Sequence, residues 1–232
     1  MFHRLGNMRT LKSEARQEGP SRVRKLNTQI ANCHRETEGM AFVKDLLSCK
    51  ATPLQVGFLI KALAPIYQLI DFEAPGISID LGALSIPWQS LSRSPAVERD
   101  LNSLTKAITE IPTSSSAAIW LEQLKTMKYC APHRFMAHVY IRYGGDLSGG
   151  QLLGRQANLI LQCNGIKPLE FWSFDQPISD LQNDLRIGFE ELELSPRHEN
   201  ELLKEAKMAF LANQLLFEEL ANLCQPNEKW RS

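Results

Sequence analysis

The sequence lacks the cysteine patterns of disulfide-rich and zinc-binding proteins. Its five cysteines are an odd number, no two have the C-x-x-C spacing, and none clusters with histidines at a zinc-site spacing. They stand at positions 33, 49, 130, 163 and 224. These absences argue against a disulfide framework and a zinc finger, and we expect free thiols in a reducing compartment.

The sequence also shows no long apolar run and no excess of either charge. No uninterrupted apolar stretch approaches the roughly 18 residues of a membrane span, and residues 227–232 are polar, so we expect no membrane anchor. Lys+Arg and Asp+Glu both number 26. This balance gives no reason to expect nucleic acid as a partner.

Strand signals are nearly absent, and only residues 77–84 alternate weakly between apolar and polar. Elsewhere apolar residues recur every three or four positions, which is the spacing of helices. The predicted helices cover 23–33, 40–47, 54–70, 97–108, 117–127, 132–162, 177–192 and 196–224. No internal repeat is visible, so the sequence predicts one all-α domain over residues 21–224.

Capping residues and helix breakers divide these segments. Ser21, Thr52 and Ser195 are predicted N-caps, the last two being followed by proline at the first helical position. Pro65 is expected to kink the third helix or end it early. The five prolines and glycines within 72–95 predict a loop there.

The two ends of the chain differ in composition from the predicted domain. Residues 1–20 are basic and lack the apolar stretch of a secretory signal. We favour a solvated extension there, with a transit peptide or a docking tail as the alternatives. Residues 225–232 are predicted to be a polar tail. A cytoplasmic protein is expected, or a plastid protein if the extension is a transit peptide.

A cluster of four glycines lies in the predicted helix 132–162, at positions 144, 145, 149 and 150. Each interior glycine costs roughly 0.8–1 kcal/mol of helix stability relative to alanine. A helix that accepts four of them is expected to bend. A phosphate-binding loop is disfavoured because no strand precedes the cluster and no Gly-Lys-Ser/Thr follows it.

Two interpretations of the glycines remain open on spacing alone. Gly145 and Gly149 lie one turn apart, which suits close packing against another helix. Alternatively, a flat and bulky ligand lies against bare backbone, which side chains would hold away. Asp146 follows Arg142 by four positions, so the two are expected to share a hydrogen-bond network beside the glycine face.

The run 142–151, Arg-Tyr-Gly-Gly-Asp-Leu-Ser-Gly-Gly-Gln, closely resembles the distal-helix signature of the heme oxygenase family. Residues 34–43 resemble its proximal-helix motif, and 205–220 resemble its last core helix. The resemblance covers about residues 21–224. It implies a single-domain, all-α helical bundle with a glycine-kinked distal helix. It also implies cleavage of heme to biliverdin, CO and Fe²⁺ with O₂.

The resemblance assigns roles to individual residues. His34 matches the axial ligand of the heme iron, and Glu38 matches the carboxylate associated with it. The residues implied in catalysis are Asp146, which organises distal water, its partner Arg142, and the heme-contacting Gly145 and Gly149. The other residues implied in heme binding are Phe42, Tyr140, Arg186, Phe210, Asn213 and Phe217.

Three positions depart from the family pattern. Gly144 stands where leucine is usual, which predicts a looser distal helix. Asn27 and Gln182 stand where lysines often lie near the heme propionates, and Arg24 or Lys25 is a candidate replacement for one of them. Because propionate contacts set the rotation of heme in its pocket, these changes leave the site of ring opening undetermined.

The chain shows no flavin, nicotinamide or iron–sulfur motif, so electrons must come from a partner. The resemblance implies ferredoxin or a flavoprotein reductase. The main alternative is a non-catalytic heme carrier or sensor on the same fold, and a further one is a non-heme helical enzyme. Asp146 together with both glycines favours the oxygenase. His138 is the rival iron ligand, which the motif match disfavours.

Overall fold

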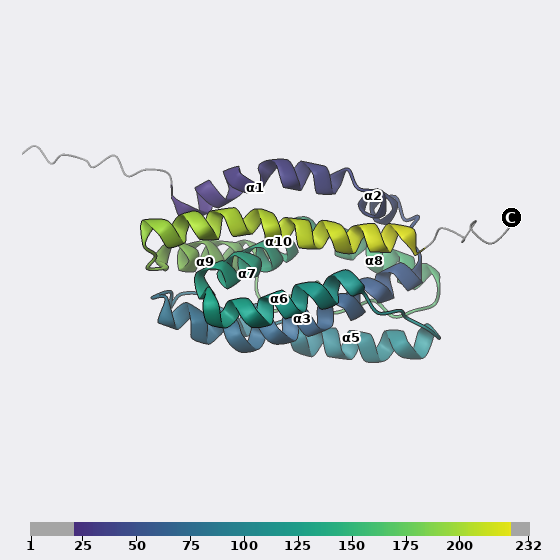
Figure 1. Cartoon of the computed structure of the whole chain (residues 1–232). Helices are drawn as coiled ribbons and strands as arrows, with labels where there is room; N and C mark the ends of the chain where they lie inside the picture. Colours follow the sequence, from purple (N-terminus) through teal and green to yellow (C-terminus); the bar gives the residue numbers. More distant parts are fainter. Residues whose placement is uncertain (1–20, 224–232) are drawn as a thin grey trace, which may run out of the picture.

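A computed structural model describes residues 21–223, which form ten helices and no strand (Figure 1). The helices are α1 Arg22–Glu38, α2 Ala41–Leu47, α3 Pro53–Asp80, α4 Trp88–Leu91, α5 Ser94–Ala107, α6 Ser115–Cys130, α7 Pro132–Asp146, α8 Gly149–Cys163, α9 Ile178–Glu191 and α10 Pro196–Asn222. The all-α prediction is confirmed. The predictions for 1–20 and 225–232 lie outside the described residues.

Three helices begin at the capping residues that the sequence predicts. The hydroxyl of Ser21 accepts a hydrogen bond from the Arg24 backbone N–H, and Ser195 caps α10 in the same way. Thr52 and Gln55 form a reciprocal capping box at the start of α3. Each cap satisfies a backbone donor that has no partner within the helix, which fixes where the helix starts.

Helix α3 is longer than predicted, because it continues through both Pro65 and Pro75 to Asp80. The expected loop over 72–95 is therefore wrong for residues 72–80, and α4 and the start of α5 also fall within it. The weak strand signal at 77–84 was misleading, since residues 77–80 are helical. Burial of α3 against α5, α6 and α7 outweighs the lost proline hydrogen bonds.

The same helix has the length and composition of a membrane span, contrary to the expectation from uninterrupted apolar runs. However, 67% of its most apolar window is buried inside the protein. Its side chains Ile60, Ile66, Tyr67 and Ile70 are fully buried. Helix α3 is thus a central element of the hydrophobic core.

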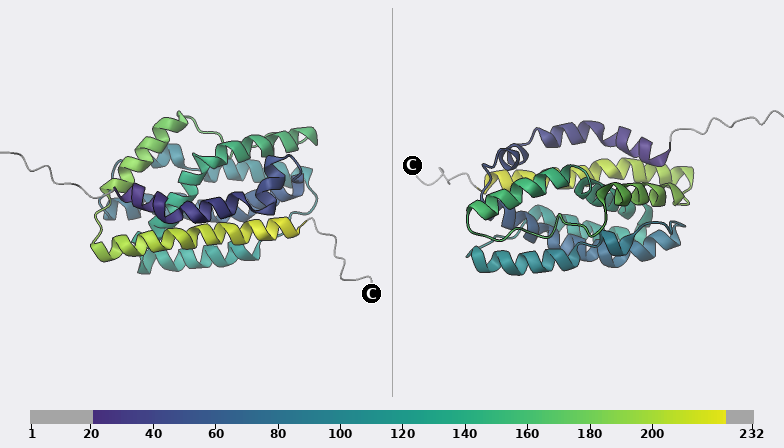
Figure 2. Two further views of the ribbon diagram at one scale, coloured as in Figure 1. Left: turned by 90° about the horizontal axis from the view of Figure 1, so that it is seen from above. Right: turned by 180° about the vertical axis from the view of Figure 1, so that it is seen from behind.

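Helix α10 makes the most extensive contacts with other helices. This helix packs against α7 on one side and α1 on another, and α1 lies along its upper side in Figure 1. The view from above shows α1 running beside α10 (Figure 2). Helix α1 covers the side of the bundle on which α7 and α8 meet, since residues of all three helices line one cavity.

Candidate active site

A cavity of about 530 Å³ lies between α1 and the junction of α7 and α8, with α2, α3, α9 and α10 contributing further walls. All the residues that the sequence analysis assigned to the site line this cavity. They are His34, Glu38, Phe42, Tyr140, Arg142, Gly145, Asp146, Gly149, Arg186, Phe210, Asn213 and Phe217. The fold thus brings together segments separated by more than 170 positions in the sequence.

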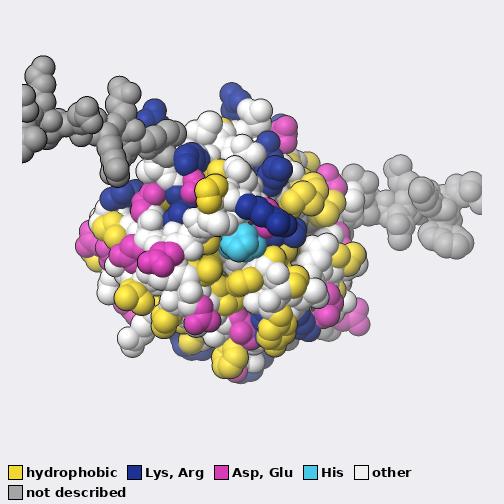
Figure 3. All heavy atoms as spheres, turned by 60° about the vertical axis from the view of Figure 1, so that its left-hand side comes forward, with side chains coloured by type: hydrophobic (Ala, Val, Ile, Leu, Met, Phe, Trp, Pro, Cys, Tyr) yellow, Lys and Arg dark blue, Asp and Glu magenta, His cyan; other side chains and the backbone are white. Residues whose placement is uncertain are grey.

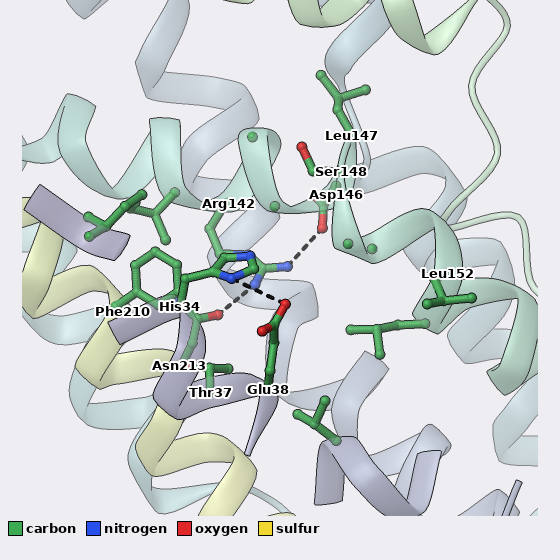
Figure 4. Close-up of a pocket in the computed structure, with 18 of the residues that line it drawn as sticks. His34, Thr37, Glu38, Arg142, Asp146, Leu147, Ser148, Leu152, Phe210 and Asn213 are labelled. Atoms are coloured by element: carbon green, nitrogen blue, oxygen red, sulfur yellow. Dashed lines mark hydrogen bonds and ion pairs between the residues drawn. The ribbon is translucent and has the colours of Figure 1, made fainter. Parts of the chain in front are cut away.

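His34 and Glu38 lie one turn apart on α1. Nδ1 of His34 is 3.4 Å from Oε1 of Glu38, and the close-up shows the two side chains beside the cavity (Figure 4). Both side chains are more than half exposed, at 53% and 63%. The edge of the Phe210 ring supports the imidazole, with ring centroids 6.1 Å apart. Because Glu38 faces Nδ1, the Nε2 atom is left to bind a ligand.

His138, the rival ligand, is occupied elsewhere. Its Nδ1 accepts a hydrogen bond from Trp120 Nε1 at 2.9 Å, and its Nε2 lies 3.0 Å from Oε1 of Glu205. The side chain is buried and is not among the residues that line the cavity. Both ring nitrogens therefore serve a buried polar network, which agrees with the choice of His34.

The glycines of this stretch fall into two groups, those that face open space and those that pack against other atoms. A Cβ atom added at Gly144, Gly145 or Gly149 would meet no heavy atom within 4 Å, because these positions face the cavity. In contrast, a Cβ at Gly154 would lie 2.4 Å from Cγ of Trp172. The close-packing interpretation is therefore wrong for Gly145 and Gly149, and the bare-backbone interpretation fits them.

The chain bends where the glycines lie, and the predicted continuous helix 132–162 is two helices. Helix α7 ends at Asp146 and α8 begins at Gly149, with two residues between them. A Cβ at Gly150 would lie 2.9 Å from the carbonyl oxygen of Gly145. Glycine at position 150 thus permits the two helices to meet closely at this bend.

Asp146 belongs to a buried network behind the glycine face. Arg142 Nη2 donates to Asp146 Oδ1 at 3.0 Å, and Arg142 Nη1 donates to Asn213 Oδ1 at 2.6 Å (Figure 4). Asn213 in turn donates from Nδ2 to the carbonyl of Ala209 at 2.7 Å. The predicted pairing of Arg142 with Asp146 is therefore present in the structure.

Tyr67 completes this network, and the sequence analysis missed it. Its hydroxyl donates to Oδ2 of Asp146 and accepts from Nη2 of Arg142 at 2.6 Å. A single tyrosine on the apolar helix α3 carries no signal that separates it from an ordinary core residue. Only the fold places its hydroxyl beside a carboxylate 79 positions away.

Burial controls the protonation of these groups. It raises the pKa of Asp146, while the Arg142 guanidinium and the Tyr67 hydrogen bond act in the opposite direction. Burial also raises the pKa of Tyr67 well above its ordinary value, so this hydroxyl remains a donor at neutral pH. The network therefore holds one buried carboxyl group whose proton affinity is increased and whose orientation is fixed.

The polar end of the cavity contains few cationic side chains. The hydroxyl of Tyr140 donates to Oδ1 of Asn27 at 2.9 Å, and Gln182 Nε2 donates to the carbonyl of Leu147 at 2.6 Å. Arg186 lines the cavity and is exposed, with a hydrogen bond to Asn183 at 2.9 Å. Asn27 and Gln182 are thus neutral polar groups at the positions where the family pattern favours lysine.

Neither suggested replacement for those lysines reaches the cavity. Lys25 Nζ forms an ion pair with Oε1 of Glu199 at 2.6 Å, and Arg24 is exposed on the same helix. Neither residue is among those that line the cavity. The prediction that Arg24 or Lys25 substitutes there is wrong in this structure, because α1 turns both residues away from the cavity.

The remaining walls are apolar and aromatic. Phe42 of α2 and Phe217 of α10 are both buried, with ring centroids 5.5 Å apart. Phe171 and Trp172 close another side from the connector between α8 and α9. A cavity with apolar walls, one polar end and a few directed polar groups suits a flat amphipathic ligand.

Known proteins with the same fold and sequence pattern support this description. The Heme oxygenase family model matches residues 22–219. Heme oxygenase from Porphyra purpurea is 27% identical over 205 residues, which cover 86% of each chain. Heme oxygenase 1 from Gallus gallus is 28% identical and covers 84% of this chain and 68% of its own length.

Solved structures agree on the fold. Heme oxygenase-1 from the cyanobacterium Synechocystis sp. PCC6803, in complex with heme, has a TM-score of 0.80 at 23% identity, covering 88% of this chain and 94% of its own. Heme oxygenase from Leptospira interrogans has a TM-score of 0.77 at 24% identity, covering 86% and 100%.

The fold is that of an all-helical protein with a cavity lined by an exposed imidazole and by bare glycine backbone. The family match extends over most of the described chain and includes every segment that carries this site. The chain belongs to the heme oxygenase family.

Proposed function

We propose that this chain binds heme in the cavity and cleaves it to biliverdin, CO and Fe²⁺, using O₂ and electrons from a partner protein. One observation carries the proposal. The exposed imidazole of His34 and the side-chain-free surface of Gly145 and Gly149 line the same cavity, with the buried Asp146 beside them. Membership of the heme oxygenase family supports the same activity.

On the α1 side, His34 is the proposed axial ligand of the iron. Nδ1 faces Glu38, so Nε2 is the ligating atom, and the carboxylate orients the ring. The contact with Phe210 limits rotation of the imidazole. The exposure of both polar side chains keeps this side of the site accessible to heme entering the cavity.

On the opposite side, Gly145 and Gly149 let the porphyrin lie close to the backbone. Bound heme supplies the iron that activates O₂ and is itself the substrate. Asp146 would hold a water molecule beside the glycine face and supply a proton to the ligand in the cavity through that water. Tyr67 and Arg142 fix the carboxylate in position, since each donates to one of its oxygens.

The polar end of the cavity is the proposed position of the heme propionates. Arg186 and Tyr140 are the side chains that contact them there, in keeping with their resemblance to the family. Asn27 and Gln182 donate or accept hydrogen bonds but carry no charge. The rotation of heme about its normal, and with it the bilin isomer, depends on this reduced set of cations.

We propose ferredoxin or a flavoprotein reductase as the electron donor, because the sequence contains no redox motif of its own. The proposed compartment is the cytoplasm, or a plastid if residues 1–20 act as a transit peptide. No membrane anchor is part of the proposal.

A heme titration followed by a single turnover tests the proposed activity. The purified chain is expected to bind one heme with a Soret band. With a reductant and O₂, that band decays while a verdin band appears. A Soret band that persists identifies a heme carrier, and no Soret band at all identifies a non-heme protein. Chromatography of the bilin then identifies the isomer.

A further inference from the structure

We infer that His133, His198 and Glu201 form a binding site for a divalent transition-metal ion, apart from the heme cavity. One ligand atom from each of the three residues lies within 4.8 Å of the other two. Nε2 of His133 is 2.8 Å from Oε2 of Glu201. The two imidazole rings are stacked, with centroids 4.1 Å apart and planes inclined by 12°.

The buried histidine directs one ring nitrogen at the carboxylate. His133 is only 5% exposed. A neutral imidazole offers a lone pair on one ring nitrogen. A ring nitrogen that hydrogen-bonds a carboxylate carries the proton, so metal binding at Nε2 requires this proton to move to Nδ1, and the ion then replaces the hydrogen bond between Nε2 and Oε2 of Glu201.

The carboxylate of Glu201 is oriented by an arginine that contacts only one of its two oxygens. Arg197 Nε donates to Oε1 of Glu201 at 2.8 Å, while Oε2 faces His133. Metal binding at Oε2 therefore requires no loss of the Arg197 contact at Oε1.

His198 supplies the third ligand from the solvent side. It lies in the first turn of α10 and is exposed, and within the described residues its ring has the stacking contact with His133 and no hydrogen bond. Figure 3 turns the end of the molecule where α10 begins toward the viewer, and a histidine side chain reaches the surface on that face. One ring nitrogen of His198 lies within 4.8 Å of the ligand atoms of the other two residues.

Two imidazoles and one carboxylate form a ligand set that suits Zn²⁺ and leaves a fourth position for water. The helices α7 and α10 both begin at this site. The partial positive charge at their N-termini repels a cation and weakens its binding. The exposed histidine must also be ordered on binding. We therefore expect weaker binding than in a structural zinc site with four protein ligands.

The metal site and the heme cavity can be tested separately. None of the three ligands lines the cavity, and His133 precedes the cavity residue Tyr140 by seven positions on α7. That spacing corresponds to about 10 Å along a helix. Metal binding can thus be measured on heme-free protein, and its result does not depend on oxygenase activity.

The experiment is calorimetric titration of Zn²⁺ into the full, untagged, heme-free chain. One saturable equivalent is expected, together with the visible absorption of low-symmetry Co²⁺ when cobalt replaces zinc. His198→Ala and Glu201→Gln should each weaken binding at least tenfold. His198 is exposed, so its substitution preserves the fold, which circular dichroism checks. His34→Ala is the matched control and should bind Zn²⁺ like the native chain.

Three results would overturn the site. The first is no saturable binding by the native chain. The second is undiminished binding by His198→Ala, which would place the ion on the thiols or elsewhere. The third is loss of binding in His34→Ala, which would place it in the heme cavity.

Discussion

Tyr67 and Asp146 are joined by a buried hydrogen bond, although 79 positions separate them in the sequence. The bond links the core helix α3 to the end of α7, just before the chain bends at the glycines. Arg142 donates to both residues and closes a triangle of polar groups. This triangle gives the carboxylate a fixed direction inside the bundle.

Substitution of Asp146 should separate heme binding from heme cleavage. Asp146→Ala is expected to bind heme with an unchanged Soret band but to form verdin about 100-fold more slowly or not at all, since the proton-delivering water loses its acceptor. Absorption spectra during a single turnover measure both properties. Native turnover by this variant would remove Asp146 from the mechanism.

Removal of one hydroxyl should test the positioning role of Tyr67. Tyr67→Phe leaves an oxygen of Asp146 and an N–H of Arg142 without this partner, which should cost about 1–3 kcal/mol of stability. Verdin formation should slow, and its pH profile should shift because the pKa of Asp146 changes. Thermal unfolding and the pH dependence of turnover measure these effects. A stability loss with an unmoved pH profile would indicate a purely structural residue.

Loss of the proposed iron ligand should change the heme spectrum, and added imidazole should reverse that change. His34→Ala is expected to bind heme more weakly and without the spectrum of an axial imidazole, and added imidazole should restore that spectrum. The side chain is half exposed, so the fold should remain stable. If His34→Ala keeps the native spectrum while a substitution of His138 abolishes it, the ligand has been misassigned.

Alanine at different glycines should have opposite effects on stability and heme binding. Gly145→Ala and Gly149→Ala face open space and should fold normally, with thermal stability equal to or above that of the native chain. Heme affinity should fall, because each methyl group occupies the cavity. Gly154→Ala should instead lose about 1–3 kcal/mol through its clash with Trp172. Equal heme affinity in all three variants would contradict the bare-backbone interpretation.

Acid stability should depend on Glu205. Burial raises the pKa of this carboxyl group, but the hydrogen bonds from His138 and Arg134 outweigh it and leave the pKa below its ordinary value of 4.5. A lowered folded pKa contributes stability that is present above pH 4.5 and is lost as the pH falls further. Glu205→Gln should therefore be less stable than the native chain at pH 7, with the difference shrinking below pH 4.5. Denaturant unfolding of both proteins at several pH values measures this difference. If the difference in unfolding free energy stays constant from pH 7 to below pH 4.5, the explanation is wrong.

Most helices were predicted from local signals, whereas the assigned site residues followed from the resemblance to the heme oxygenase family. Ser21 and Thr52 are recognisable caps, and the distal glycines form a dense motif. The continuation of α3 through Pro75 could not be predicted, because tertiary burial there overrides a local breaker. Tyr67 was missed for a related reason, since its role depends on a partner brought near only by folding.

The glycines also show where spacing alone is insufficient. Gly145 and Gly149 have the one-turn separation of a packing motif, as do Gly150 and Gly154. Only the structure reveals that the second pair approaches other protein atoms, while the first pair faces the cavity. Gly150 also lines the cavity, but a Cβ there would meet the carbonyl oxygen of Gly145, so neighbouring glycines differ in the room they have for a side chain.

Trp172 lies in the connector that follows α8 and presses against Gly154, while its carbonyl accepts a hydrogen bond from Gln151 at 3.1 Å. Gln151 also donates to the carbonyl of Asp146 at 3.0 Å. The indole of Trp172 therefore sets the spacing between this connector and α8, both of which line the cavity. Changes in the length of this connector would alter the width available to the porphyrin without replacing any group that reacts.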